Sequence, residues 1–338
     1  MNYCITKEKM NRCIEGLKKE YRIYAPRRFE KRGWKSDTDS IRYAEVNSVE
    51  EIVHDAISDF SPKEVFFPIV QTLFFFKGDE CSEITVDDRK MILFARPCDI
   101  NGFRRLDTIF LKNGQNEDFF YKRLRDKMKI FMIECREGWD DCFCVSMDSN
   151  ETDNYSVALR FEPDHLLVNV KDAVFQKYFS AEPVKAFTPE FVKANTKKVR
   201  LPYIRDSEHL KKAHGFELWR DINDKCLGCG ACTAVCVTCS CFDTTDIIYN
   251  EISPDGERRR VWSSCMSEDF TLMAGGHSVR KTVGERLRFR VLHKAYDYKT
   301  RFGIENMCVG CGRCDGRCPE EISFSDTINV LSNALEVV

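Results

Sequence analysis

Apolar runs alternate with polar or helical segments in the first part of the chain. Three of these runs are EVFFPIVQTLFFF at 64–76, MILFARPCD at 91–99 and KIFMIECRE at 129–137. Their length and continuous apolar character are typical of central strands that are buried on both faces. We therefore predict an α/β (or α+β) domain over residues 1–170.

Three further segments have readable patterns. Residues 156–170 (SVALRFEPDHLLVNV) predict an antiparallel hairpin. At 48–60 (SVEEIVHDAISDF), apolar residues recur at helical spacing, and Ser48 with Glu51 forms a capping-box signature. The last segment, 322–338, predicts an amphipathic helix that closes the chain.

The composition indicates a globular protein of a reducing compartment. With 52 Lys and Arg against 54 Asp and Glu, the net charge of -2 gives no support to nucleic-acid binding. The charged N-terminus lacks an apolar signal segment, so the 18 cysteines are expected to stay reduced in the cytoplasm. No apolar run approaches the ~20 residues of a membrane helix, and we expect no membrane segment.

Two cysteine runs near the C-terminus carry the strongest chemical signal, because both read C-x2-C-x2-C-x3-C. This is the spacing of bacterial two-cluster ferredoxins, in which the fourth cysteine of each run binds the cluster of the other run. We therefore predict two 4Fe-4S sites. The first site has the ligands Cys226, Cys229, Cys232 and Cys318. The second site has the ligands Cys308, Cys311, Cys314 and Cys236.

Glycines lie between the ligands of both runs, at positions 228, 230, 310 and 312. A backbone that wraps around a cluster must turn sharply, and glycine accepts the positive φ that such turns require. A structural zinc site is the alternative for a single C-x2-C pair. Two complete runs of identical spacing favour iron–sulfur clusters.

Four more cysteines follow the ends of predicted strands in the N-terminal domain. They are Cys98, Cys135, Cys142 and Cys144. The carboxyl ends of parallel strands share one edge of a sheet, so these thiols could converge on a third 4Fe-4S cluster. Ordinary buried cysteines and a zinc site are the alternatives that remain open at this point.

The remaining sequence divides around the cysteine runs. Residues 171–224 are polar and predict linker helices, and 225–338 predict a mainly helical, two-cluster ferredoxin-like domain with a long insert at 242–307. Within 258–301, eleven basic residues stand against four acidic ones, which is a local excess that could steer an acidic partner. Neither a dinucleotide fingerprint nor a nucleophile motif occurs, so no residue is assigned a catalytic role.

The longer strings around these cysteines carry a family resemblance over nearly the whole chain. They are RPCDINGFRRLD, ECRE, CFCVSM, KCLGCGACTAVCVTCSCFD, AGGHSVRKT and MCVGCGRCDGRCP. The chain resembles the A subunit of anaerobic sulfite reductase, within a wider group that includes the β subunit of soluble NADP-linked hydrogenases. The resemblance implies a third cubane at the four N-terminal cysteines.

The same resemblance implies partners. One is a flavin subunit that oxidises NAD(P)H, and the other is a sirohaem subunit that reduces sulfite to sulfide, with this chain relaying electrons between them. A hydrogenase β subunit is the alternative within the same chemistry, and nickel in the partner would distinguish it from sirohaem. An iron–sulfur redox sensor or a zinc-stabilised interaction module is the alternative of another class, which metal analysis would decide.

Overall fold

The computed structural model describes residues 1–85, 87–179, 187–253 and 255–336. The chain forms two compact units, and each is assembled from separate stretches of sequence. The first unit contains Met1–Phe66, Asp88–Lys197 and Val309–Cys311. The second unit contains Phe67–Asp87, Lys198–Cys308 and Gly312–Val338. Part of the predicted linker, residues 180–186, lies outside the described residues.

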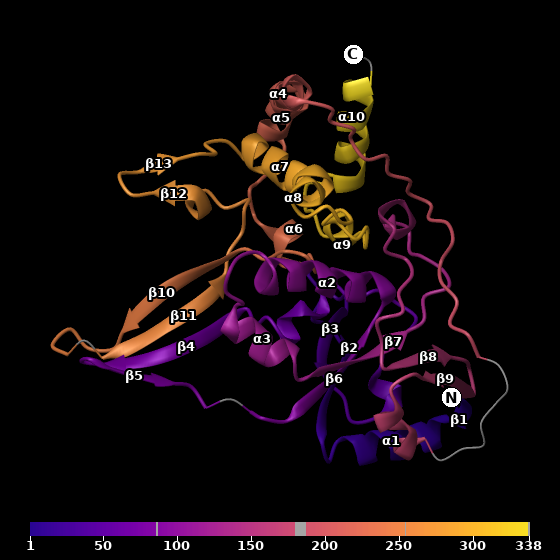
Figure 1. The fold of residues 1–338 in the computed structure, drawn as a ribbon. Coiled ribbons are helices and arrows are strands. Elements are labelled where there is room, and N and C mark those ends of the chain that lie inside the picture. The colour runs from indigo at the N-terminus through magenta and orange to yellow at the C-terminus, as the bar shows by residue number, and fades with distance from the viewer. Residues whose placement is uncertain (86, 180–186, 254, 337–338) are drawn as a thin grey trace. The chain divides into compact units, whose positions relative to one another are not determined.

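The first unit is built on a seven-stranded mixed sheet in the order β1-β9-β8-β7-β6-β2-β3 (Figure 1). Its strands are β1 (Asn2–Thr6), β2 (Tyr21–Phe29), β3 (Ser40–Glu45), β6 (Lys90–Ala95), β7 (Met128–Ile133), β8 (Val157–Phe161) and β9 (His165–Val170). The four central strands β2, β6, β7 and β8 pair in parallel. The outer pairs are antiparallel, including the β8–β9 hairpin, so the hairpin prediction for 156–170 is confirmed.

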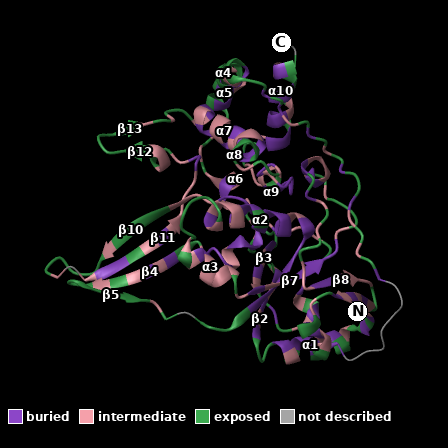
Figure 2. Cartoon of the chain, viewed as in Figure 1, coloured by how far each residue is buried: buried purple, intermediate pink, exposed green. Residues whose placement is uncertain are grey.

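Of the helices in the first unit, α1 (Lys7–Leu17) and α2 (Pro97–Leu111) contact the sheet, and α3 (Phe119–Arg125) packs against α2. Strands β6 and β7 are buried along almost their whole length (Figure 2), as continuous apolar runs require. The predicted α/β character of the N-terminal domain is confirmed.

Two sequence predictions in this region are wrong. The run at 64–76 is not a central strand of the seven-stranded sheet, because β4 (Val70–Lys77) pairs with β11 (Gly256–Trp262) in the second unit. The segment 48–60 forms only a 3-10 turn at Val49–Glu51.

The missing helix at 48–60 has a physical explanation in its hydrogen bonds. Asn11 Oδ1 accepts from Val49 N at 2.7 Å, and no side chain caps the turn from Ser48. Further along, one guanidinium nitrogen of Arg96 donates to the carbonyl oxygens of His54 and Ala56 at 2.6 and 3.0 Å. These carbonyls are therefore satisfied without intrahelical bonds.

The second unit combines a four-stranded antiparallel sheet, in the order β10-β11-β4-β5, with short helices. Besides β4 and β11, its strands are β5 (Glu80–Glu83), β10 (Phe242–Ile248), β12 (Leu272–Met273) and β13 (His277–Ser278). The helices are α4 (Ser207–Gly215), α5 (Leu218–Asp221), α6 (Ala231–Ala234), α7 (Val283–Leu292), α8 (Tyr298–Phe302), α9 (Arg313–Gly316) and α10 (Phe324–Glu336). A π-helical turn at His293–Asp297 joins α7 to α8.

This mixture means that the mainly helical character predicted for the C-terminal domain is not confirmed. The closing helix is confirmed as α10, while residues 337–338 of that prediction lie outside the described residues. Within the described part of the chain, no helix is long and apolar enough to cross a membrane.

Phe131 on β7 provides a test of the first core. Its ring is fully buried and packs against Phe94 and Phe175 with centroid distances of 5.3 and 5.0 Å. We expect Phe131→Ala to lower the free energy of unfolding by about 3–5 kcal/mol, because the cavity cannot close. Chemical denaturation under anaerobic conditions measures this. Phe119→Ala, at a ring that is 53% exposed, is the control and should cost less than about 1 kcal/mol.

Candidate functional site

The two cysteine runs share a local backbone conformation. Gly228 and Gly310 have φ values of +65° and +61°, and Gly230 and Gly312 have +73° and +75°. The second glycine of each pair is the N-cap of a one-turn helix, α6 in the first run and α9 in the second. The predicted use of positive φ at these four positions is confirmed.

The four thiols of the first predicted site line one small cavity. Cys226, Cys229 and Cys232 come from the first run, and Cys318 comes from the end of the second. Leu227, Met266, Pro319 and Ile322 complete the wall of the cavity. Cys318 therefore lies with the three thiols of the first run, as the crossed arrangement requires at this site.

Backbone amides support two of these sulfurs. Gly228 N donates to Cys226 Sγ at 3.4 Å, and Ile322 N donates to Cys318 Sγ at 3.3 Å. Hydrogen bonds of this kind stabilise negative charge on a sulfur and are one way in which proteins tune cluster potentials. The cavity thus offers soft ligands together with amide donors.

Two buried cations, Lys294 and Arg290, lie beside three thiols of the second predicted site. The Lys294 ammonium interacts with Cys236 and Cys308, and Lys294 O accepts from Cys308 N at 3.1 Å. Burial opposes ionisation of Cys236, but Lys294 and Arg290 outweigh it and lower the pKa of this thiol. Cys314 interacts with Arg290. Cys311, the remaining predicted ligand, belongs to the first unit.

Cys98 and Cys135 follow the carboxyl ends of two parallel strands, and Cys142 and Cys144 lie in the loop after Cys135. Cys98 is the second residue of α2, directly after β6, and Cys135 follows β7. Burial raises the pKa of Cys142 to about 12 and that of Cys144 to about 11, and both thiols interact with Cys135. The structure thus brings Cys135, Cys142 and Cys144 together.

The segment Val309–Cys311 packs against this loop within the first unit. Phe143 N donates to Gly310 O at 2.8 Å, Ser149 Oγ donates to Val309 O at 2.6 Å, and Cys142 Sγ lies 3.7 Å from Cys311 O. Sequence reasoning did not anticipate this contact, because the two stretches are far apart along the chain.

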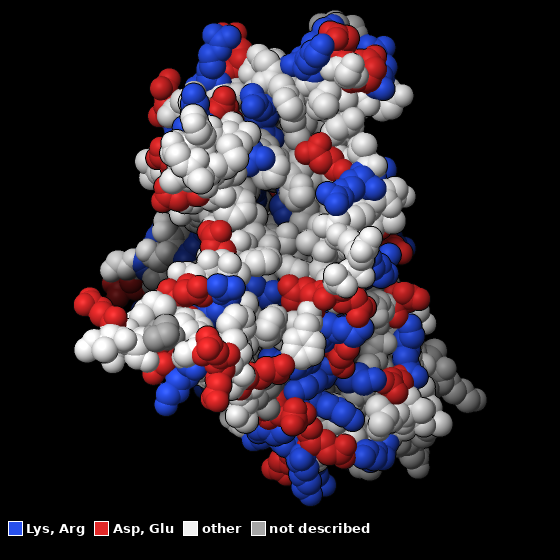
Figure 3. All heavy atoms as spheres, turned by 60° about the vertical axis from the view of Figure 1, so that its left-hand side comes forward, with Lys and Arg blue, Asp and Glu red and all other residues white. Residues whose placement is uncertain are grey.

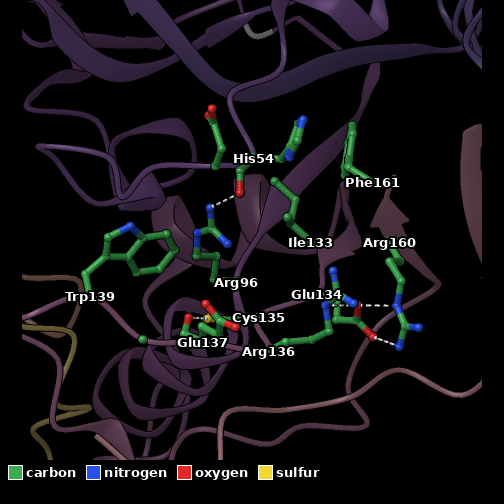
Figure 4. A pocket seen from close by; sticks show the side chains of 12 residues that line it. His54, Arg96, Ile133, Glu134, Cys135, Arg136, Glu137, Trp139, Arg160 and Phe161 are labelled. Carbon is green, nitrogen blue, oxygen red and sulfur yellow. Dashed lines mark hydrogen bonds and ion pairs between the residues drawn. The ribbon is translucent and has the colours of Figure 1, made fainter. Parts of the chain in front are cut away.

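A cavity of about 470 Å³ opens beside Cys135 (Figure 4). The guanidinium of Arg96 stacks on Trp139 at 4.3 Å, and Arg160 forms two hydrogen bonds with Glu134 at 2.5 and 2.8 Å. Cys135 Sγ donates to Glu137 O at 3.3 Å. The cavity lies beyond the ends of parallel strands, where α/β sheets commonly bind ligands.

Cys239, Cys241 and Cys265 line a separate cavity of about 320 Å³ in the second unit. A hydrogen bond from the Cys241 thiol lowers the pKa of Cys265. These three thiols lie beside Cys236, which also lines this cavity.

The basic residues of the segment 258–301 do not all lie on the surface, as their number had suggested. Four of these eleven basic residues, Arg260, Arg286, Arg290 and Lys294, are buried. On the face shown in Figure 3, basic and acidic side chains are interspersed. Sequence reasoning missed the buried cations, although the spacing of 286, 290 and 294 on one helix was a signal that could have revealed them.

The donor set at the first site suits an iron–sulfur cluster. Soft thiolates, flexible glycine loops and amide donors are the features that hold such clusters. Across the described ranges, no three or more Cys, His, Asp or Glu side chains converge closely enough to hold a single metal ion.

Comparison with known proteins agrees with this chemistry. Residues 225–322 match the 4Fe-4S dicluster domain family. The chain is 30% identical over 334 residues to the sulfhydrogenase 2 subunit beta of Pyrococcus furiosus, covering 94% of this chain and 95% of that protein. No solved structure shows significant similarity.

Gly310 offers a test of how closely the first unit packs around its cysteines. A Cβ at this position would lie 2.6 Å from the carbonyl carbon of Phe143 and 2.7 Å from Cys144 N. Gly310→Ala should therefore destabilise the protein by about 1–2 kcal/mol through positive φ and by about 1–3 kcal/mol more through the backbone overlap.

Gly78→Ala is the matched control, because Gly78 has a φ of +58° and no atom within 4 Å of its added Cβ. This variant should lose only the stability that positive φ costs an alanine. If thermal denaturation shows the same loss of stability in both variants, the close packing around Gly310 is contradicted.

Proposed function

Since this chain belongs to the iron–sulfur electron-transfer subunit family that includes the sulfhydrogenase 2 β subunit, we propose that it is the electron-transfer subunit of a hydrogenase complex. In this role it relays electrons between a flavin subunit that oxidises or reduces NAD(P) and a subunit that contains the nickel–iron site. The similarity extends over nearly the full length of both chains, which supports this assignment over that of an isolated ferredoxin.

The observation that carries the proposal is the crossed thiol cavity of the first site. Cys226, Cys229, Cys232 and Cys318 would hold one 4Fe-4S cluster, and Cys308, Cys311, Cys314 and Cys236 would hold a second. Each cluster, when bound, accepts and releases single electrons. The chain supplies thiolates, amide donors and apolar walls that limit water near the sulfurs.

A third cluster is part of the proposal. Cys98, Cys135, Cys142 and Cys144 are its ligands, and the mutual approach of the last three supports it. Protons must leave these thiols when the cluster binds, since thiolates are the ligands. The raised pKa values of Cys142 and Cys144 mean that the cluster-free site holds neutral thiols at pH 7.

An anaerobic sulfite reductase subunit is the second candidate, favoured by the motif strings around the cysteines. Its partners would be the same type of flavin subunit and a sirohaem subunit. Purification of the complex under anaerobic conditions from its native host distinguishes the two: nickel in the complex supports the hydrogenase, and sirohaem absorbance supports the reductase.

Iron analysis of the same material tests the cluster count. We expect about twelve iron atoms per chain from three cubanes and no stoichiometric zinc. A value near eight would remove the N-terminal cluster, while stoichiometric zinc without iron would favour an interaction module.

Crossed ligation predicts which cluster each fourth cysteine serves. Cys318→Ala should damage the cluster of the first site, and Cys236→Ala that of the second. Electron paramagnetic resonance of the reduced proteins, together with iron content, measures the loss. Cys81→Ala, at an exposed cysteine outside all three groups, is the control and should leave both signals intact. The reverse assignment of signals would contradict the crossing.

A further inference from the structure

Three buried cations form a row along one helix of the second unit. Arg286 and Arg290 lie in α7, and Lys294 lies in the π-helical turn that follows it. They are spaced four residues apart, which places them on one face of the helix. Their exposed fractions are only 6%, 2% and 5%.

None of the three has a carboxylate partner among the residues that the structure describes. Arg290 donates to Cys232 O at 3.0 Å, Lys294 donates to Thr238 O at 3.0 Å and to Thr238 Oγ1 at 2.8 Å, and Arg286 reaches Lys281 O at 3.5 Å. These acceptors are all neutral. Within the described structure, the Nε atoms of both arginines are buried without a hydrogen-bond acceptor.

The ionisable neighbours of the row are cysteines of the two C-terminal sites, together with Cys239 and Cys265. Arg286 interacts with Cys226 of the first site. Arg290 interacts with thiols of both sites, namely Cys232, Cys236 and Cys314. Lys294 interacts with Cys236 and Cys308 of the second site.

A buried charge without a counter-charge is costly, and a protein normally pairs it. Thiolates bound to an iron–sulfur cluster supply the negative charge that is otherwise missing here. We propose that Arg286, Arg290 and Lys294 are the built-in counter-ions of the two clusters. This inference rests on the proposed function, because it requires that both sites hold clusters.

Two consequences follow from this role. Reduction adds one electron, and hence one negative charge, to a cluster, so a nearby buried cation favours the reduced form and raises the reduction potential. When the clusters are absent, the same three charges lose their counter-charge. Replacing the three cations with neutral side chains should then make the cluster-free protein more stable than the cluster-free wild type.

Redox titration of the purified full-length holoprotein, monitored by electron paramagnetic resonance, tests the first consequence. Arg286→Met should lower the potential of the first site, Lys294→Met that of the second, and Arg290→Met that of both. We expect at least a tenfold loss in the equilibrium constant for reduction, which is 59 mV for one electron.

Two further variants separate charge from packing. Arg290→Lys keeps the positive charge, so the reduction potentials of both sites should stay close to those of the wild type. Lys299→Met, which removes an exposed cation from the adjacent helix α8, should leave both potentials unchanged. Unchanged potentials in all three methionine variants with full iron content would overturn the proposal.

Chelation covers the case in which a methionine variant fails to load its clusters. After iron removal, the triple variant R286M/R290M/K294M should unfold at a higher urea concentration than iron-free wild type. If the triple variant is instead the less stable of the two, the cations serve packing and the proposal fails. A wild-type protein purified without iron–sulfur absorbance would refute the proposed function itself, which is a separate outcome.

Discussion

The burial of three cations beside the cysteines of the two C-terminal sites is the constraint on which the second unit depends. Iron–sulfur ligation requires several thiolates in one small apolar space, and that space has a low dielectric constant. Arg286, Arg290 and Lys294 are buried in the same region. Their helix includes a π-helical turn, an irregularity that is often found at functional sites.

Sequence alone predicted the parts of the site that are set by local spacing. The cysteine intervals and the intervening glycines fixed the conformation of each run, because three ligands of one cluster must come from a single loop. The edge that carries Cys98 and Cys135 was also predictable, since β6 and β7 are continuous apolar runs that pair in parallel. In both cases, residues close together in sequence determine the local structure, so the sequence pattern is sufficient to predict it.

Long-range pairing could not be read in the same way. An apolar run such as 70–77 satisfies the pattern of a buried strand in any sheet, and nothing in its own residues specifies β11 as its partner. The contact of Val309–Cys311 with the Phe143 loop is likewise between distant stretches of the chain. The helix predicted from the spacing at 48–60 does not form, because Asn11 and Arg96 hydrogen-bond to backbone groups of this segment. Both residues are remote from it in sequence.

The β4–β5 hairpin has a consequence for how the chain is made. Its residues emerge from the ribosome early, but the strand that covers them comes much later, since Val70 pairs with Val261 and Phe76 with Gly256. An open strand edge is a template for aggregation, so the nascent chain must tolerate or shield this hairpin during most of translation. A truncated gene that begins at Lys198 would also omit two of the four strands, leaving β11 unpaired on one side.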